Sequence, residues 1–180
     1  MKTENIVQYV LRLTVTLLLI TGIVAAALAG VNAITKDAIA ANQEKKTQDA
    51  LAVVLPGVDG LQKVELTGDT GIVSEVYASG ENYAIKVLPA GFDGAVTMMV
   101  GVANGQVTGI SVISHTETPG LGAVAAAQNA KGEAFRGQFV GQSGTLAVGD
   151  QIDAMSGATI TSKAVVTGVN AALAYAENLG

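Results

Sequence analysis

The stretch GAVTMMVGVANGQVTGISVISH, residues 94–115, is the strongest indication of how this chain folds. Two runs that are apolar at most positions, 95–102 and 107–113, flank the dipeptide Asn104-Gly105. An Asn-Gly pair between apolar runs is the strongest short-range signal for a β-hairpin with a two-residue turn. Because strands that are covered on both faces are apolar at nearly every position, we expect this hairpin to be the central pair of an antiparallel sheet.

The flanking sequence extends the sheet and adds helices to it. Alternating runs at 72–78 and 83–88 surround a Gly-Glu-Asn turn and predict another hairpin. A Gly- and Ala-rich loop and helix region follows over 120–141, and we expect a short strand that ends near Ile152. Small and apolar residues at three- and four-residue steps predict a final helix over 158–178. Strands followed by mixed helices predict the α+β class, with helices packed on an antiparallel sheet.

The N-terminal part is much more apolar than the rest. Residues 13–35 are 23 consecutive residues without a charge, and as a helix they would be roughly 35 Å long, enough to cross a bilayer core. Residues 36–55 predict an amphipathic stalk helix that ends at Pro56-Gly57. We therefore expect three parts: a cytoplasmic tip with a transmembrane helix (1–35), a stalk helix and linker (36–60), and an extracytoplasmic domain (61–180).

The apolar segment has two interpretations. A cleaved signal peptide would use Lys2 and Arg12 as its basic flank and the small residues 25–30 as its cleavage site. Secretory apolar cores are usually about 7–15 residues long, so the length of this one favours an uncleaved anchor. Lys2 and Arg12 favour a cytoplasmic N-terminus, although three lysines after the span weaken that bias. Under either interpretation the C-terminal domain lies on the extracytoplasmic side of the cell (inner) membrane.

The composition excludes several kinds of site. The chain has no cysteine, so it has neither disulfides nor thiolate ligands for iron–sulfur or zinc sites. His115 is the only histidine, which excludes a metal or haem site with several histidine ligands. The formal net charge of −5 argues against nucleic acid, because its binders usually present a basic face. Redox chemistry in this chain would therefore need a bound organic cofactor.

A polar loop follows the central hairpin. The sequence SHTETPGLG, residues 114–122, contains the histidine, a carboxylate at Glu117 and a Pro-Gly turn that presents Leu121. Loops that follow a buried strand often carry ligand sites. The simpler interpretation is a turn in which Glu117 and Thr118 bind local backbone groups, and the loop alone does not decide between the two.

A second polar stretch, DAMSGAT at 153–159, precedes the final helix. Gly157 and Ala158 have almost no side chain, so a bulky planar or phosphorylated group could approach the backbone there. The free N–H groups and the positive dipole end of the following helix suit a phosphate. We interpret Ser156 as the N-cap of this helix, which explains one hydroxyl. The helix start is crowded with four hydroxyl residues: Ser156, Thr159, Thr161 and Ser162.

The two polar stretches resemble the signatures of FMN-binding domains. DAMSGAT is similar to the flavinylation signature, which has Asp, two variable positions, Ser or Thr, and then Gly-Ala-Thr; Ala154 stands where a glycine is common. HTETPGLG resembles the second signature of these domains. With these two motifs in this order, C-terminal to one membrane span, the chain resembles the G subunits of Rnf electron-transport complexes over essentially its whole length. The C subunits of sodium-pumping NADH:quinone oxidoreductases are the related alternative.

The resemblance implies a set of site residues. Thr159 would carry FMN through a phosphoester bond, made after export by a flavin transferase that recognises the stretch containing Asp153. The implied neighbours of the flavin are Glu117, Thr118, Leu121 and Gly122. The other candidates for contacts with the cofactor are Ser156, Gly157, Ala158, Thr161 and Ser162.

The resemblance also implies a function. The chain would be a membrane-anchored electron carrier that works with other membrane and redox subunits of an ion-translocating (Na⁺ or H⁺) ferredoxin:NAD oxidoreductase. No side chain is expected to act as a catalytic acid or base, because the chemistry would be that of the flavin. Two alternatives stay open: a stand-alone flavinylated surface domain for extracellular electron transfer or sensing, and a non-redox binding domain in which the SGAT stretch is only a cap.

Overall fold

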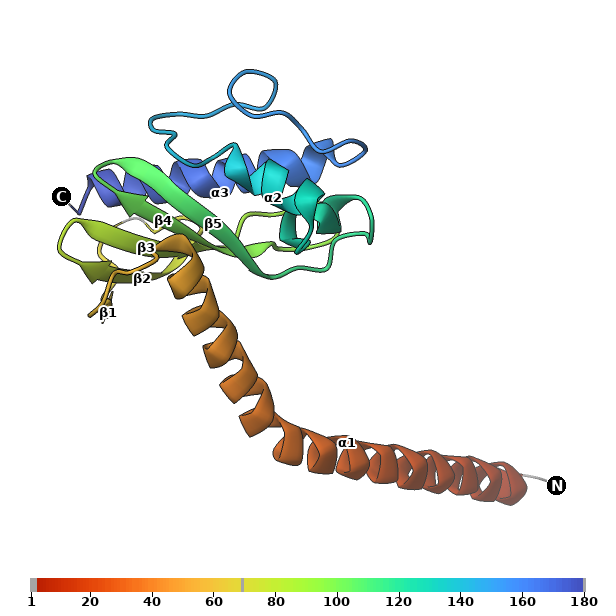
Figure 1. Cartoon of the computed structure of the whole chain (residues 1–180). Coiled ribbons are helices and arrows are strands. Elements are labelled where there is room, and N and C mark those ends of the chain that lie inside the picture. The colour runs from red at the N-terminus through yellow and green to blue at the C-terminus, as the bar shows by residue number, and fades with distance from the viewer. Residues whose placement is uncertain (1–2, 69, 180) are drawn as a thin grey trace. The chain divides into compact units, whose positions relative to one another are not determined.

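A computed structural model of the chain describes residues 3–68 and 70–179 (Figure 1). The expected α+β class is confirmed. The elements in chain order are α1 (Thr3–Val54), β1 (Gln62–Val64), β2 (Val73–Ser79), β3 (Asn82–Val87), β4 (Thr97–Ala103), β5 (Gln106–Ser114), the 3-10 helix η1 (Gly122–Ala126), α2 (Ala130–Gly137) and α3 (Thr159–Glu177).

The five strands form one antiparallel sheet in the order β1-β2-β3-β4-β5. Asn104 and Gly105 join β4 to β5, with φ angles of 52° and 71°. Positive φ at both central residues is what a type I′ turn requires, and this turn matches the twist of the strands that it joins. The predicted central hairpin is therefore confirmed, with strand ends within two residues of the expected ones.

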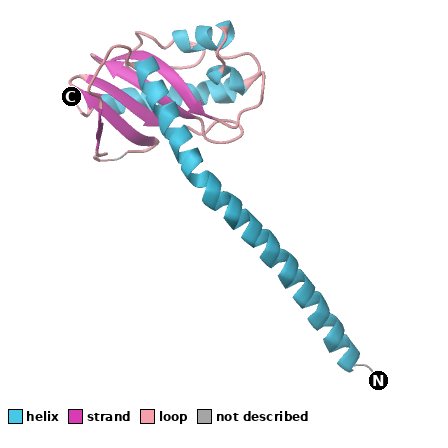
Figure 2. Cartoon of the chain, turned by 60° about the horizontal axis from the view of Figure 1, so that its bottom comes forward, coloured by secondary structure: helices cyan, strands magenta, loops and turns pink. Residues whose placement is uncertain are grey.

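Both faces of the sheet are covered, which explains why β4 is apolar at nearly every position. Helix α3 packs on one face, where Met98, Val100 and Val102 join its apolar residues in the larger core. On the other face, Met99 packs with the last turns of α1 in a second core. Figure 2 shows the strands in magenta and the helices in cyan. The side chains of β4 alternate between these two cores, as the period of two of a strand requires.

The last turn of α1 lies directly against the backbone of β4 and β5. A Cβ added to Gly101 would overlap the backbone oxygen of Val54, and one added to Gly109 would lie 3.3 Å from Val54 Cα. The Thr108 hydroxyl donates a hydrogen bond to the same Val54 oxygen, at 2.6 Å. Because glycine has no side chain, this pair of glycines lets a helix end contact the sheet at backbone distance.

Helix α1 runs without interruption from Thr3 to Val54, so the expected span and the expected stalk are one helix. It ends at Val54, one residue before the predicted end, and the turn at Pro56-Gly57 follows Leu55. The segment Ile6–Val54 is long and apolar enough to cross a membrane, by its length and composition. By its contacts the chain divides into two compact units, up to Lys45 and from Lys46 onward. The expected division at residues 35 and 60 stays a prediction.

The predicted short strand before Ile152 is wrong. Over 142–152, the described residues form one isolated bridge, between Val148 and Ile152, and no strand. The Asn170 side chain binds both backbone groups of Leu146, with N–O distances of 2.9 Å. The side-chain amide of Asn170 thus takes the place of a neighbouring strand. The alternation of apolar and polar residues in the sequence cannot reveal such a contact.

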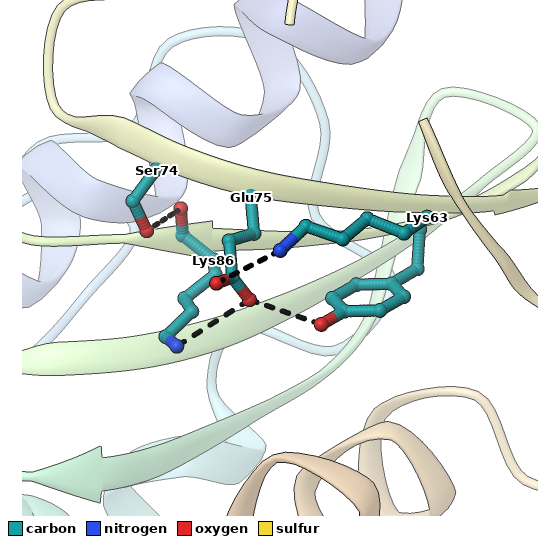
Figure 3. Close-up of polar contacts among 5 residues, drawn as sticks. Lys63, Ser74, Glu75 and Lys86 are labelled. Atoms are coloured by element: carbon teal, nitrogen blue, oxygen red, sulfur yellow. Dashed lines mark hydrogen bonds and ion pairs between the residues drawn. The ribbon is translucent and has the colours of Figure 1, made fainter. Parts of the chain in front are cut away.

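The short edge strand β1 is tied to the sheet by Glu75 (Figure 3). The Glu75 carboxylate lies 3.1 Å from Lys63 Nζ on β1 and 3.4 Å from Lys86 Nζ on β3, and it accepts a hydrogen bond from the Tyr77 hydroxyl at 3.0 Å. Burial alone would raise the pKa of Glu75. The hydrogen bonds from Lys63 and Tyr77, with the two lysine charges, outweigh burial and lower that pKa.

Candidate functional site

Helix α3 begins at Thr159, one residue after the expected start, but Ser156 does not cap it. The N-cap residue is Ala158, and no side chain caps it with a hydrogen bond. Gly157, at φ +73°, turns the chain between Ser156 and the helix, and Ser156 is exposed. The hydroxyl that organises this turn belongs to Ser162 and is fully buried; it accepts from the Met155 N–H and donates to the Ala158 oxygen, both at 2.9 Å. The predicted N-cap is therefore wrong.

A pocket of about 360 Å³ opens beside the start of α3. It brings together three segments that are far apart in the sequence: the loop between β3 and β4, the loop after β5, and the 157–161 segment. Its lining residues are Phe92, Glu117, Thr118, Leu121, Gly122, Gly157, Ala158, Thr159, Ile160 and Thr161. Eight of these ten are residues that the sequence motifs predicted, so the pocket unites the two motifs.

Glu117 connects the walls of the pocket. Its side chain is 5% exposed, and its Oε1 accepts a hydrogen bond from the backbone N–H of Phe92 at 2.7 Å. Its Oε2 accepts a hydrogen bond from the buried Thr161 hydroxyl, also at 2.7 Å. Added Cβ atoms at Gly91 and Gly122 would overlap these carboxylate oxygens, so both glycines are required for the close fit.

Two exposed apolar side chains line the pocket. Phe92 is 66% exposed and Leu121 is 44% exposed. A Cβ on Gly157 would lie 3.0 Å from Leu121 Cδ2, which shows how closely the two motifs approach each other. Phe92 was not predicted from the sequence. An aromatic residue in a glycine-rich loop, GFDG at 91–94, is the only local signal that could have indicated it.

The other predicted residues lie outside this pocket. Asp153 and Ser156 are exposed and line a second groove of about 720 Å³, which Leu121 also lines. The Gln138 side chain holds the backbone of Asp153 by accepting from its N–H at 2.7 Å, so the carboxylate of Asp153 is not used for anchoring. Ser162 lies in the core beneath the turn and lines neither cavity.

Comparisons with known proteins match two parts of the chain to protein families. The FMN-binding domain family matches residues 91–174, and the RnfG N-terminal region matches residues 1–54. The G subunit of the Na⁺-translocating ferredoxin:NAD⁺ oxidoreductase complex of Acetobacterium woodii is 32% identical over 99% of both chains. The G subunit of the proton-translocating complex of Clostridium ljungdahlii is 37% identical over 86% of this chain and 83% of its own. The G subunit of the ion-translocating oxidoreductase complex of Methanosarcina acetivorans is 30% identical over 91% and 93%.

The chain belongs to the family of Rnf-complex G subunits. The range that matches the FMN-binding domain contains every residue that lines the pocket beside α3. The N-terminal match ends at residue 54, and it therefore includes the helix turn that packs against Gly101 and Gly109. The two matches thus include the residues of the apolar helix and all the residues that line the pocket.

Proposed function

We propose that this chain is the flavoprotein subunit of an Rnf-type complex and that it carries FMN as a phosphoester of Thr159. In that step Thr159 Oγ would lose its proton and attack the phosphorus of an FMN group held in a pyrophosphate ester, and the phosphoanhydride bond would break and release the other phosphate as a nucleoside monophosphate. FMN, when bound, supplies the electron-transfer chemistry. The chain would relay electrons between other membrane and redox subunits of an ion-translocating ferredoxin:NAD oxidoreductase, as the names of its relatives indicate.

One observation carries this proposal: an exposed threonine stands at an uncapped helix N-terminus inside the pocket. Thr159 is the first residue of α3, and the N-cap residue, Ala158, makes no side-chain hydrogen bond to the free N–H groups there. A phosphate on Thr159 would lie near those donors and near the positive end of the helix dipole. The exposed apolar surfaces of Phe92 and Leu121 suit a flat aromatic ring system. The residues present therefore suit both the phosphate and the aromatic ring system of FMN.

The second groove supports a role for a flavin transferase. Asp153 is exposed while its backbone is held by Gln138, so an approaching enzyme would meet a carboxylate in a defined place. We place the domain on the extracytoplasmic side, with α1 as an uncleaved single-pass anchor and the N-terminus in the cytoplasm. The basic residues Lys2 and Arg12 support that orientation.

The decisive experiment is flavin fluorescence of the denatured, full-length chain after expression with a flavin transferase. We expect a fluorescent band for the wild type and for Ser156→Ala, and none for Thr159→Val. Valine has nearly the shape of threonine, so loss of the band would report the missing oxygen. A Thr159→Val band as bright as the wild type would refute the attachment site, and a dark wild-type band would refute the covalent flavin.

A further inference from the structure

Glu117 is a buried acid in the wall of the pocket, and its charge has no ion-pair partner in the part of the chain that the structure describes. Both hydrogen bonds that it makes within the pocket wall are accepted from donors: the Phe92 N–H and the Thr161 hydroxyl. Both donors suit a carboxylate that accepts one hydrogen bond at each of its oxygens. The two donors and the nearby N-terminal end of α3 stabilise this negative charge.

The carboxylate is held in one position. Gly91 and Gly122 leave no room for a Cβ between their backbones and the two oxygens of Glu117. Because both oxygens are bonded to the chain, neither needs a bond from a ligand. Any effect of Glu117 on a molecule in the pocket would therefore act through space, as a fixed charge in a wall with little solvent.

We propose that Glu117 lowers the reduction potential of the cofactor held in this pocket. This inference rests on the proposed function, since it requires flavin on Thr159. Reduction brings negative charge to the isoalloxazine, and a buried like charge in the wall disfavours that gain. Glu117 is thus a tuning residue, distinct from the threonine that carries the cofactor.

The test is a redox titration of the flavinylated, full-length protein, followed by the flavin absorbance. Glu117→Gln keeps the shape of the side chain and removes its charge. We expect the ratio of reduced to oxidised flavin at a given potential to rise by at least tenfold, which is about +30 mV for a two-electron couple. Glu177→Gln is the matched control, because it removes an exposed charge at the far end of α3, roughly 27 Å along the helix.

A second variant separates charge from shape. Thr161→Val keeps the Glu117 charge but removes one of its two donors, so the charge is less compensated and the potential should become more negative. If Glu117 acted only as a structural clamp, both variants would loosen the pocket and shift the potential in the same direction, which would overturn the proposal. An unchanged potential in Glu117→Gln would also overturn it. If Glu117→Gln fails to fold, Thr161→Val alone decides. A reduction potential of Thr161→Val equal to or above that of the wild type would then overturn the proposal.

Failure of the proposed function would look different. A wild-type chain without fluorescence on a denaturing gel overturns the attachment and this role together. If the wild type is fluorescent but Glu117→Gln has the same reduction potential, only the role of Glu117 is overturned.

Discussion

Substitution of Gly101 by alanine should detach the end of α1 from the sheet. The new Cβ would overlap the backbone oxygen of Val54 and the Thr108 hydroxyl. The hydroxyl can rotate away, but the backbone oxygen cannot. Since carbon atoms pack at about 3.5 Å from their neighbours, the helix end has to withdraw by roughly 1 Å.

The cost follows from what this contact buries. Four apolar side chains at the helix end are at most 7% exposed: Ala50, Leu51, Val54 and Leu55. A gap of about 0.5–1 Å loses roughly a quarter to a half of their dispersion energy, which for this cluster is about 1–2 kcal/mol. Loss of the hydrogen bond from Thr108 to the Val54 oxygen adds about 1 kcal/mol. The free energy of unfolding should therefore fall by about 2–3 kcal/mol, which lowers Tm by roughly 6–15 °C for a domain of this size.

Thermal unfolding of the detergent-solubilised, full-length chain, followed by the near-ultraviolet circular dichroism of tyrosine, measures this effect. Tyr77 packs on the same face and is 9% exposed, so its signal reports the contact. Gly109→Ala should cost less, because its Cβ would lie 3.3 Å from Val54 Cα and needs only a small shift. Gly137→Ala has open space and should be neutral or slightly stabilising. A Gly101→Ala variant with the same Tm as Gly137→Ala would show that the helix end does not depend on this glycine.

Two further predictions concern single side chains. Ser162→Ala should lower the free energy of unfolding by about 1–3 kcal/mol, because it leaves the buried Met155 N–H unpaired, whereas the exposed Ser156→Ala should change it by less than about 0.5 kcal/mol. Chemical denaturation measures both, and equal costs would contradict the contribution of the buried Ser162 hydroxyl to the turn before α3. Glu75 has a lowered pKa in the folded state, so the stability that it contributes is present above its ordinary pKa of 4.5 and is lost as the pH falls through the lowered value. The difference in Tm between the wild type and Glu75→Gln should thus shrink as the pH falls from about 7 to below the ordinary pKa of 4.5, and a constant difference would count against the ion pairs.

Much of the fold could be predicted because local patterns decide it. The Asn104-Gly105 turn tolerates positive φ at both positions, and the apolar runs around it need no partner to be recognised. Helix α3 has one apolar and small face, so its existence and ends were predicted within one residue. The failed strand before Ile152 had a weaker pattern, and Asn170 bonded its backbone instead.

The candidate site could be predicted only in part. The two motifs belong to segments that line one pocket, and Glu117 and Thr161 both lie in it. The capping interpretation of Ser156 was wrong because a glycine with positive φ separates it from the helix. Ser162, within the helix, instead holds the turn before α3, because its buried hydroxyl accepts a hydrogen bond from the Met155 N–H. Phe92 was missed because no repeating pattern connects its loop to the other two.

The amino-acid sequence was sufficient to predict most elements of this protein, its apolar N-terminal helix, and the family to which its two motifs point. These properties depend on residues that are close together along the chain, where propensity, periodicity and turn chemistry act directly. The folded chain was needed to learn that Glu117 bonds Thr161, a residue 44 positions away, and that the end of α1 rests on Gly101. Such contacts depend on how segments pack in space, and a one-dimensional pattern does not contain those distances. Glu117 is therefore, in the folded chain, a buried carboxyl group that bonds two other segments of the same protein.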